Sequence, residues 1–127
     1  MGDLSTNFSR WEFSCKCGCG YNTVDAELLT VLQWLRYETK TPITINSGCR
    51  CVEHNEVVQK ESNKHYIPYS SKSQHMLGRA ADIVVVGVDP EEVYNLINKY
   101  FPSRLGLIQY DYFIHVDSRS RVYREKK

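Results

Sequence analysis

The sequence predicts an α+β fold in which helices pack on one side of a small antiparallel sheet, within a single domain spanning residues 1–127. Three observations lead to this prediction. The chain has 127 residues and 42% hydrophobic content, enough for one compact core and too little for two ordinary domains. Two stretches carry the apolar spacing of amphipathic helices. Short β-branched or alternating runs lie between and after them, as the strands of a sheet require.

The first helix is predicted from about residue 24 to residue 36. Its apolar residues recur at the spacing that lines one helix face, at Val24, Leu28, Val31, Leu32 and Leu35. Thr23 stands where an N-cap side chain is favoured. Pro42 stops the helical region, and a short β-branched strand follows over 43–46 and runs into a turn at 47–48.

The middle of the chain predicts a weaker helix over 52–61. A surface loop is predicted over 62–74, because this stretch shows neither the helical nor the strand periodicity of apolar residues. A further helix is predicted to begin at Asp89, which can cap it. Pro90 suits the first helical position, and Glu92 has the capping-box offset. The inner face of this helix is predicted to consist of Val93, Leu96, Ile97 and Tyr100.

The remaining strands of the predicted sheet lie at 80–86, 105–109 and 112–116. The first is a continuous apolar run of the buried type. The other two are joined by a tight turn at 110–111 and are expected to form an antiparallel hairpin. The basic tail over 119–127 is expected to be a strand edge that frays into disorder.

The charge balance excludes several classes of partner. There are 16 basic and 15 acidic residues, and a formal net charge of +1 gives no strong field toward nucleic acid or an anionic membrane. No apolar run approaches the length of a membrane span, and the first residues lack the features of a signal peptide. We therefore expect a monomer, not inserted in a membrane, that recognises its partner through a local site.

Five cysteines form two clusters, and their chemistry stays open at this stage. They are Cys15, Cys17, Cys19, Cys49 and Cys51. An odd number cannot be fully paired within one chain, and the single-residue spacing differs from the gaps of most structural zinc sites. Free packed thiols, one or two disulfides, and a second metal site are the alternatives. None of them makes the cysteines catalytic.

The strongest chemical signal lies between residues 73 and 83, where a histidine at a loop end precedes a carboxylate within a hydrophobic strand. These residues are His75 and Asp82, and Gly78 between them fits a turn back toward the strand. A lone carboxylate would be costly to bury there. Coordination of a metal ion would remove that cost.

The last predicted strand adds a second histidine. Its alternation places Asp111, Phe113, His115 and Asp117 on one face. Two histidines and one carboxylate are a familiar ligand set for catalytic zinc, with the fourth position left to water. A base beside that water would complete a hydrolase. These residue types are compatible with one catalytic Zn²⁺, although an isolated His and Asp seven residues apart are common without a metal.

Four segments together form a longer pattern: Asn-Phe-Ser-Arg-Trp-Glu-Phe at 7–13, Ser-Gly-Cys-Arg at 47–50, Ser-x-His-x-x-Gly-x-Ala-x-Asp-Ile at 73–83, and Phe-Ile-His-Val-Asp at 113–117. The pattern resembles the M15 peptidases, which are zinc D-Ala-D-Ala carboxypeptidases and murein endopeptidases with a fold shared by the hedgehog signalling domain. Its opening is typical of small members, often carried by phages. The resemblance implies that His75, Asp82 and His115 are the zinc ligands.

The resemblance also implies roles around the metal. Arg50 would approach the substrate carbonyl or carboxylate and stabilise developing negative charge, and Ser73 would line the same cleft. Many relatives place Glu or Asp three residues before the last zinc histidine, where this chain has Tyr112. Asp117 therefore ranks first as the general base, since it matches the His-x-Asp of the endopeptidase branch, and Asp111 ranks second. The other role open to Asp117 is to support a metal ligand.

The function implied is hydrolysis of peptide bonds in bacterial peptidoglycan, with the stem peptide as substrate. The enzyme would be a D-Ala-D-Ala carboxypeptidase or a murein endopeptidase of the endolysin type. It would act at the cell wall, and either a leader that has been removed or another protein, such as a phage holin, would give it access. The alternative is a non-enzymatic binding module that retains zinc on the same fold. The two acidic candidates beside His115 favour the enzyme, and the missing family carboxylate keeps the alternative open.

Overall fold

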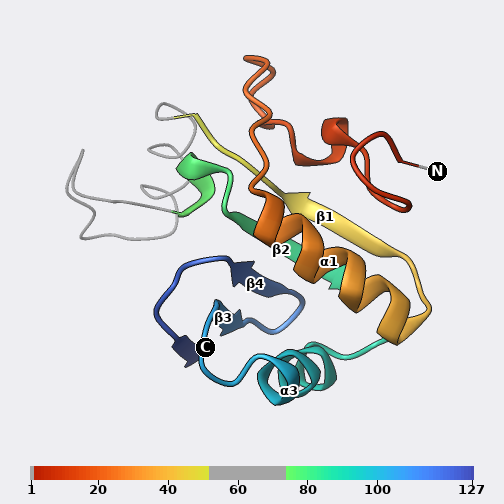
Figure 1. Cartoon of the computed structure of the whole chain (residues 1–127), viewed down its shortest axis with the longest axis vertical. Helices are drawn as coiled ribbons and strands as arrows, with labels where there is room; N and C mark the ends of the chain where they lie inside the picture. Colours follow the sequence, from red (N-terminus) through yellow and green to blue (C-terminus); the bar gives the residue numbers. More distant parts are fainter. Residues whose placement is uncertain (1, 52–73) are drawn as a thin grey trace.

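The computed structural model describes residues 2–51 and 74–127. Its elements are, in chain order, η1 (Arg10–Phe13), α1 (Ala26–Thr39), β1 (Ile43–Ser47), η2 (Gln74–Leu77), β2 (Ala80–Val85), α3 (Pro90–Tyr100), β3 (Gly106–Gln109), β4 (Ile114–Asp117) and β5 (Tyr123–Lys126), shown in Figure 1. The helix predicted over 52–61 and nearly all of the loop predicted over 62–74 lie outside the described residues. Within the described ranges, no helix is both long and apolar enough to cross a membrane.

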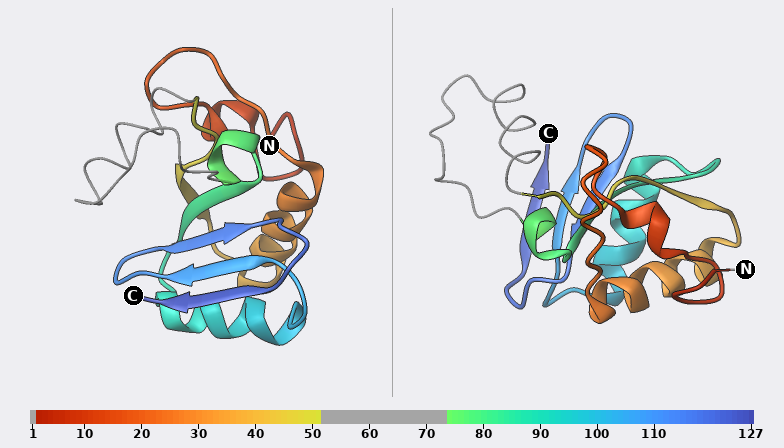
Figure 2. Two further views of the ribbon diagram at one scale, coloured as in Figure 1. Left: turned by 90° about the vertical axis from the view of Figure 1, so that its left-hand side faces the viewer. Right: turned by 90° about the horizontal axis from the view of Figure 1, so that it is seen from above.

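The sheet has five strands in the order β1-β2-β4-β3-β5, which confirms the α+β class. Neighbouring strands are antiparallel except β3 and β5, which pair in parallel. The expectation of a purely antiparallel sheet is thus wrong, because the sheet is mixed. The tail is an edge strand as expected, but Tyr123–Lys126 is paired with β3 and not frayed. Figure 2 shows β5 alongside β3. The polar segment Tyr-Arg-Glu-Lys carries no apolar alternation, so its pairing could not be recognised from its own sequence.

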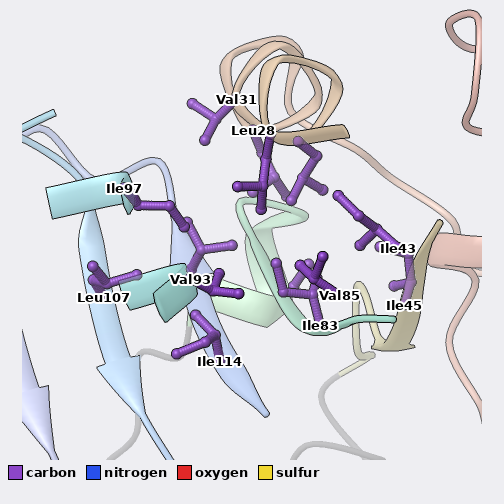
Figure 3. Packing of buried hydrophobic residues seen from close by; sticks show 14 of the residues in the cluster. Leu28, Val31, Ile43, Ile45, Ile83, Val85, Val93, Ile97, Leu107 and Ile114 are labelled. Carbon is purple, nitrogen blue, oxygen red and sulfur yellow. The ribbon is translucent and has the colours of Figure 1, made fainter. Parts of the chain in front are cut away.

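Both helices cover the same face of the sheet. Alternation turns Ile83 of β2 and Ile114 of β4 toward this face, and the register pairs these two residues directly. They join one apolar cluster with Leu28 and Val31 of α1 and Ile97 of α3 (Figure 3). The opposite face of β2 and β4 therefore carries the polar side chains, away from the helices.

The helix ends differ in detail from the prediction. The N-cap of α1 is Asp25 and not Thr23, because the Asp25 carboxylate accepts hydrogen bonds from the backbone N–H groups of the first turn. Pro90 begins α3 as predicted, but Asp89 makes no capping hydrogen bond with its side chain. On α3, Tyr94 is buried, whereas Tyr100 is largely exposed.

Candidate metal centre

The pairing of β2 with β4 creates the centre of the site. Asp82 and His115 are direct cross-strand partners, and both project from the face that the helices leave uncovered. The Asp82 Oδ1 lies 3.1 Å from the His115 Nδ1. Two residues that are 33 apart in the chain thus meet because of strand register alone.

The short helix η2 brings the second histidine to the same carboxylate oxygen. His75 is buried, and its Nε2 lies 3.3 Å from the Asp82 Oδ1. Gly78 ends this turn at a φ of +68°, in the left-handed region that favours glycine, and a Cβ there would lie 2.4 Å from the Thr23 carbonyl oxygen. The turn predicted at Gly78 is confirmed, and it directs the chain from η2 into β2.

Each histidine ring already has one nitrogen engaged. The His75 Nδ1 donates to the carbonyl oxygen of Gly48 at 2.6 Å, since a carbonyl can only accept. The His115 Nε2 donates to the Asp117 Oδ2 at 2.7 Å for the same reason. Hydrogen bonds of this kind fix the tautomer and ring orientation of metal-binding histidines. The remaining nitrogen of each ring points toward Asp82.

The spacing of these three ligand atoms fits a metal ion. Tetrahedral zinc with nitrogen and oxygen ligands at about 2.0–2.2 Å places neighbouring ligand atoms roughly 3.3–3.6 Å apart. The distances from the Asp82 Oδ1 to His115 and to His75 are 3.1 and 3.3 Å. All three residues offer ligand atoms within 4.8 Å of one another. The residue types and the geometry therefore both suit a small cation.

The protonation equilibria of the site also favour a positive charge at its centre. Burial tends to raise the pKa of Asp82, but hydrogen bonds from His115 and His75 hold this pKa well below its usual range. Burial tends to lower the pKa of His115, yet the hydrogen bonds to Asp117 and Asp82 raise it above its ordinary value. The carboxylate is therefore ionised at neutral pH and attracts a cation to the histidines.

Arg50 lies at the edge of this centre. Its guanidinium is nearly buried and donates to the second carboxylate oxygen of Asp82 at 3.2 Å through Nη2. Its Nε donates to the Ser47 Oγ at 3.2 Å. Its backbone N–H donates to the carbonyl oxygen of His75 at 2.9 Å. The segment after β1 thus holds both a cationic side chain and η2 beside the carboxylate.

Asp117 occupies a different environment from the one expected of a base. Its side chain is fully buried, and the Arg119 guanidinium donates two hydrogen bonds of 2.7 Å to its carboxylate. The backbone N–H groups of Gly106 and Arg119 each donate to its Oδ1 at 3.2 Å, while its Oδ2 accepts from His115. Both oxygens are therefore occupied, an arrangement that suits orientation of His115 rather than proton abstraction.

One predicted residue, Asp111, does not join this group. Asp111 is exposed and lies in the bend before β4, so the strand alternation expected to turn it toward His115 does not extend that far. The turn spans four residues, with the Tyr110 N–H donating to the Phe113 carbonyl at 3.0 Å. Tyr112 is 86% exposed. Ser73 lies outside the described residues.

Two contributions near the centre were not predicted from the sequence. The Gly48 carbonyl orients His75, and the backbone of the Ser-Gly-Cys-Arg segment gives no sequence signal for this. Tyr110 is half-buried, stacks on Phe113, and lies near enough that the charges of Asp82 and Arg50 act on it. Burial, chiefly, raises the pKa of Tyr110, which keeps the phenol protonated at neutral pH. Tyr110 lies in a predicted turn, so its closeness to Asp82 and Arg50 could not be predicted from the sequence.

The comparisons with known proteins agree with the class of protein that this site indicates. The sequence model of the family described as Peptidase M15 matches residues 6–117. No curated protein and no solved structure matches the chain. Because the match covers most of the chain, this protein belongs to the peptidase M15 family. It is thus a member of a hydrolase family that acts on peptides, and it has candidate metal-binding groups at the site.

Proposed function

We propose that this protein is a zinc peptidase that hydrolyses peptide bonds of bacterial peptidoglycan. It would act either as a D-Ala-D-Ala carboxypeptidase or as a murein endopeptidase at the cell wall. The observation that carries the proposal is the orientation of the two histidine rings. In each ring one nitrogen donates a hydrogen bond, from His75 to Gly48 and from His115 to Asp117. The other nitrogen lies 3.3 Å from the Asp82 Oδ1 in His75 and 3.1 Å from it in His115. Membership of the peptidase M15 family supports the same reaction class.

His75, Asp82 and His115 would hold the zinc ion. At such a site zinc polarises a carbonyl and lowers the pKa of a bound water toward about 7. The residues around it set the geometry. Gly48 and Asp117 each accept a hydrogen bond from one ring nitrogen, so the other nitrogen of each ring faces Asp82 and is the one that would bind zinc.

Arg50 and Tyr110 are the groups proposed to act on the substrate. The Arg50 guanidinium is held by Asp82 and Ser47, so it presents its positive charge at a fixed position. It would bind the substrate carboxylate or stabilise the negative charge that develops on the scissile carbonyl oxygen. Tyr110 has a protonated phenol close to these charges and can donate a hydrogen bond.

A zinc-containing binding module without hydrolytic activity is the second candidate. The specific observation behind it is that Asp117 has no oxygen left to accept a proton, while Tyr112 stands where many relatives carry the acid. Asp111 is the accessible carboxylate of the hairpin. Hydrolysis therefore depends on Asp111, or on a residue outside the described ranges, to take up the proton.

Digestion of purified peptidoglycan distinguishes the two candidates. The zinc-loaded protein is incubated with peptidoglycan, and separately with a stem pentapeptide ending in D-Ala-D-Ala, and the products are identified by mass spectrometry. Release of the terminal D-alanine indicates the carboxypeptidase, and cleavage within the stem or cross-link indicates the endopeptidase. Asp82→Asn is the inactive reference. Tight binding of stem peptide without any cleavage would make the binding module the better description.

A further inference from the structure

A cluster of thiols lies outside the site described above. Cys15, Cys17, Cys19 and Cys51 bring their sulfur atoms within 4.8 Å of one another. They come from two segments: the loop after η1 and the end of the segment that follows β1. Cys15 is buried, Cys51 is partly buried, and the other two are exposed. All five cysteines of the chain are described, and none forms a disulfide.

The distances between the sulfur atoms match the edges of a tetrahedron around a metal ion. Zinc with thiolate ligands at about 2.3 Å separates neighbouring sulfurs by about 3.8 Å. Here Cys15 lies 3.4 Å from Cys17 and 3.8 Å from Cys51, and Cys17 lies 3.7 Å from Cys51. A disulfide would require about 2.05 Å between two of them. Two disulfides would join the cysteines in separate pairs, and the two pairs would not need to lie close to each other.

The backbone supports the same arrangement. The Gly18 N–H donates to the Cys15 carbonyl at 3.2 Å, which closes a tight turn around Cys17. Gly18 has a φ of +83°, a conformation that a side chain would disfavour. The Cys51 N–H donates to the Cys15 sulfur at 3.4 Å. A sulfur that accepts a backbone hydrogen bond is stabilised as a thiolate, the form that binds metals.

The chemistry of four adjacent thiols also suits a cation. Four thiolates without a cation would repel one another. A divalent ion would replace the thiol protons and release them to solvent.

We propose that Cys15, Cys17, Cys19 and Cys51 bind a second zinc ion that has a structural role. Four thiolates around zinc form a closed site without an open position for substrate. The ion would link the loop after η1 to the segment after β1. This segment contains Arg50, which Cys51 directly follows. The fifth cysteine takes no part, because the Cys49 thiol instead donates to the Tyr21 carbonyl at 3.0 Å. Of the three interpretations open from the sequence, this selects the second metal site.

Metal analysis of the full-length protein, purified under reducing conditions and equilibrated with zinc, tests the proposal. We expect two zinc ions per chain in the parent protein. His115→Ala should retain one zinc, and Cys17→Ser with Cys51→Ser should also retain one. Cys49→Ser is the matched control, since it replaces a buried cysteine outside the cluster, and it should retain two.

Cobalt substitution identifies the ligands without relying on the cysteine variants, which could fail to fold. Thiolate-bound Co²⁺ gives intense charge-transfer absorption in the near ultraviolet, which histidine and carboxylate ligands do not give. We expect this absorption in the parent protein and in His115→Ala. Its absence from the parent protein, or a mass showing that two of the four thiols are joined as a disulfide after zinc loading, would overturn the proposal. The peptidoglycan assay is independent of both measurements, so either proposal can fail without the other.

Discussion

Asp82 and His115 face each other across β2 and β4, and the carboxylate oxygen and ring nitrogen that meet are 3.1 Å apart. This single register position creates the candidate metal centre, because His75 needs only the turn at Gly78 to reach the same oxygen. A shift of one residue between these strands would turn His115 into the apolar core.

Removal of one ligand should remove one metal ion. We expect Asp82→Asn and His115→Ala each to lose one equivalent of zinc, and the lost binding to lower the free energy of unfolding. The loss would be about 2.7 kcal/mol when free zinc is 100 times the dissociation constant. Elemental analysis and thermal unfolding with and without a chelator measure both effects. Asp89→Asn, at an exposed carboxylate beside α3, is the control. Unchanged zinc content in both variants would place the metal elsewhere.

Asp117→Asn separates orientation from base catalysis. Because Asp117 is fully buried and holds the His115 ring, we expect this variant to bind zinc about 10–100-fold more weakly and to recover most of its activity at saturating zinc. Loss of a general base instead costs about 10²–10⁴ in rate at full occupancy. Hydrolysis measured across a zinc titration distinguishes the two. A large loss that persists at saturation would restore Asp117 as the base, and the same result for Asp111→Asn would assign the role there.

Arg50→Lys tests the proposed role of the guanidinium. Lysine keeps the charge but cannot donate to Ser47 and Asp82 from one planar group. We expect zinc content to be retained and the rate of peptide hydrolysis to fall by about 10²–10³, the usual cost of losing a donor to the developing oxyanion. Ser47→Ala should give a smaller loss of rate, since it removes only the hydroxyl that accepts a hydrogen bond from the Arg50 Nε. Equal activity of Arg50→Lys and the parent protein would exclude Arg50 from the reaction.

Gly106→Ala should disturb Asp117 across the sheet. Gly106 and Asp117 are paired between β3 and β4, and a Cβ at Gly106 would lie 2.3 Å from the Asp117 Oδ2. We expect a loss of about 1–3 kcal/mol in the free energy of unfolding, measured by urea denaturation. In an Asp117→Ala background the same substitution should cost much less, because the clashing carboxylate is absent. Additive losses would show that the carboxylate is not the cause.

Arg124→Ala should test the parallel edge strand. The Arg124 guanidinium donates to the carbonyl oxygens of Phe101 and Leu105, each at 2.7 Å, and so ties β5 to the chain between α3 and β3. We expect a loss of about 1–3 kcal/mol in the free energy of unfolding. Arg121→Ala is the matched control, because Arg121 is exposed. Equal effects of the two substitutions would argue against an ordered tail.

The sequence by itself determined the class of fold, the family and the candidate ligands. Local periodicity was sufficient for α1, β1, β2, α3 and the last hairpin, because burial of one face imposes a repeat on the residues that form it. Alternation in β4 separates Ile114 and Val116 from His115 without any knowledge of the partner strand. The spacing of His75, Asp82 and His115 within the M15 pattern predicted the set of residues that the structure brings together.

Only the tertiary structure decided which residues meet and what each of them contacts. Strand register, the parallel pairing of β5, and the convergence of Cys51 with the Cys15 loop depend on contacts between residues far apart in the chain. The same holds for Asp117: its position two residues after His115 suggested a base, and the Arg119 fork and the backbone of Gly106 occupy its oxygens instead. A carboxylate takes its role from its hydrogen-bond partners and its burial, and neither is encoded in local spacing.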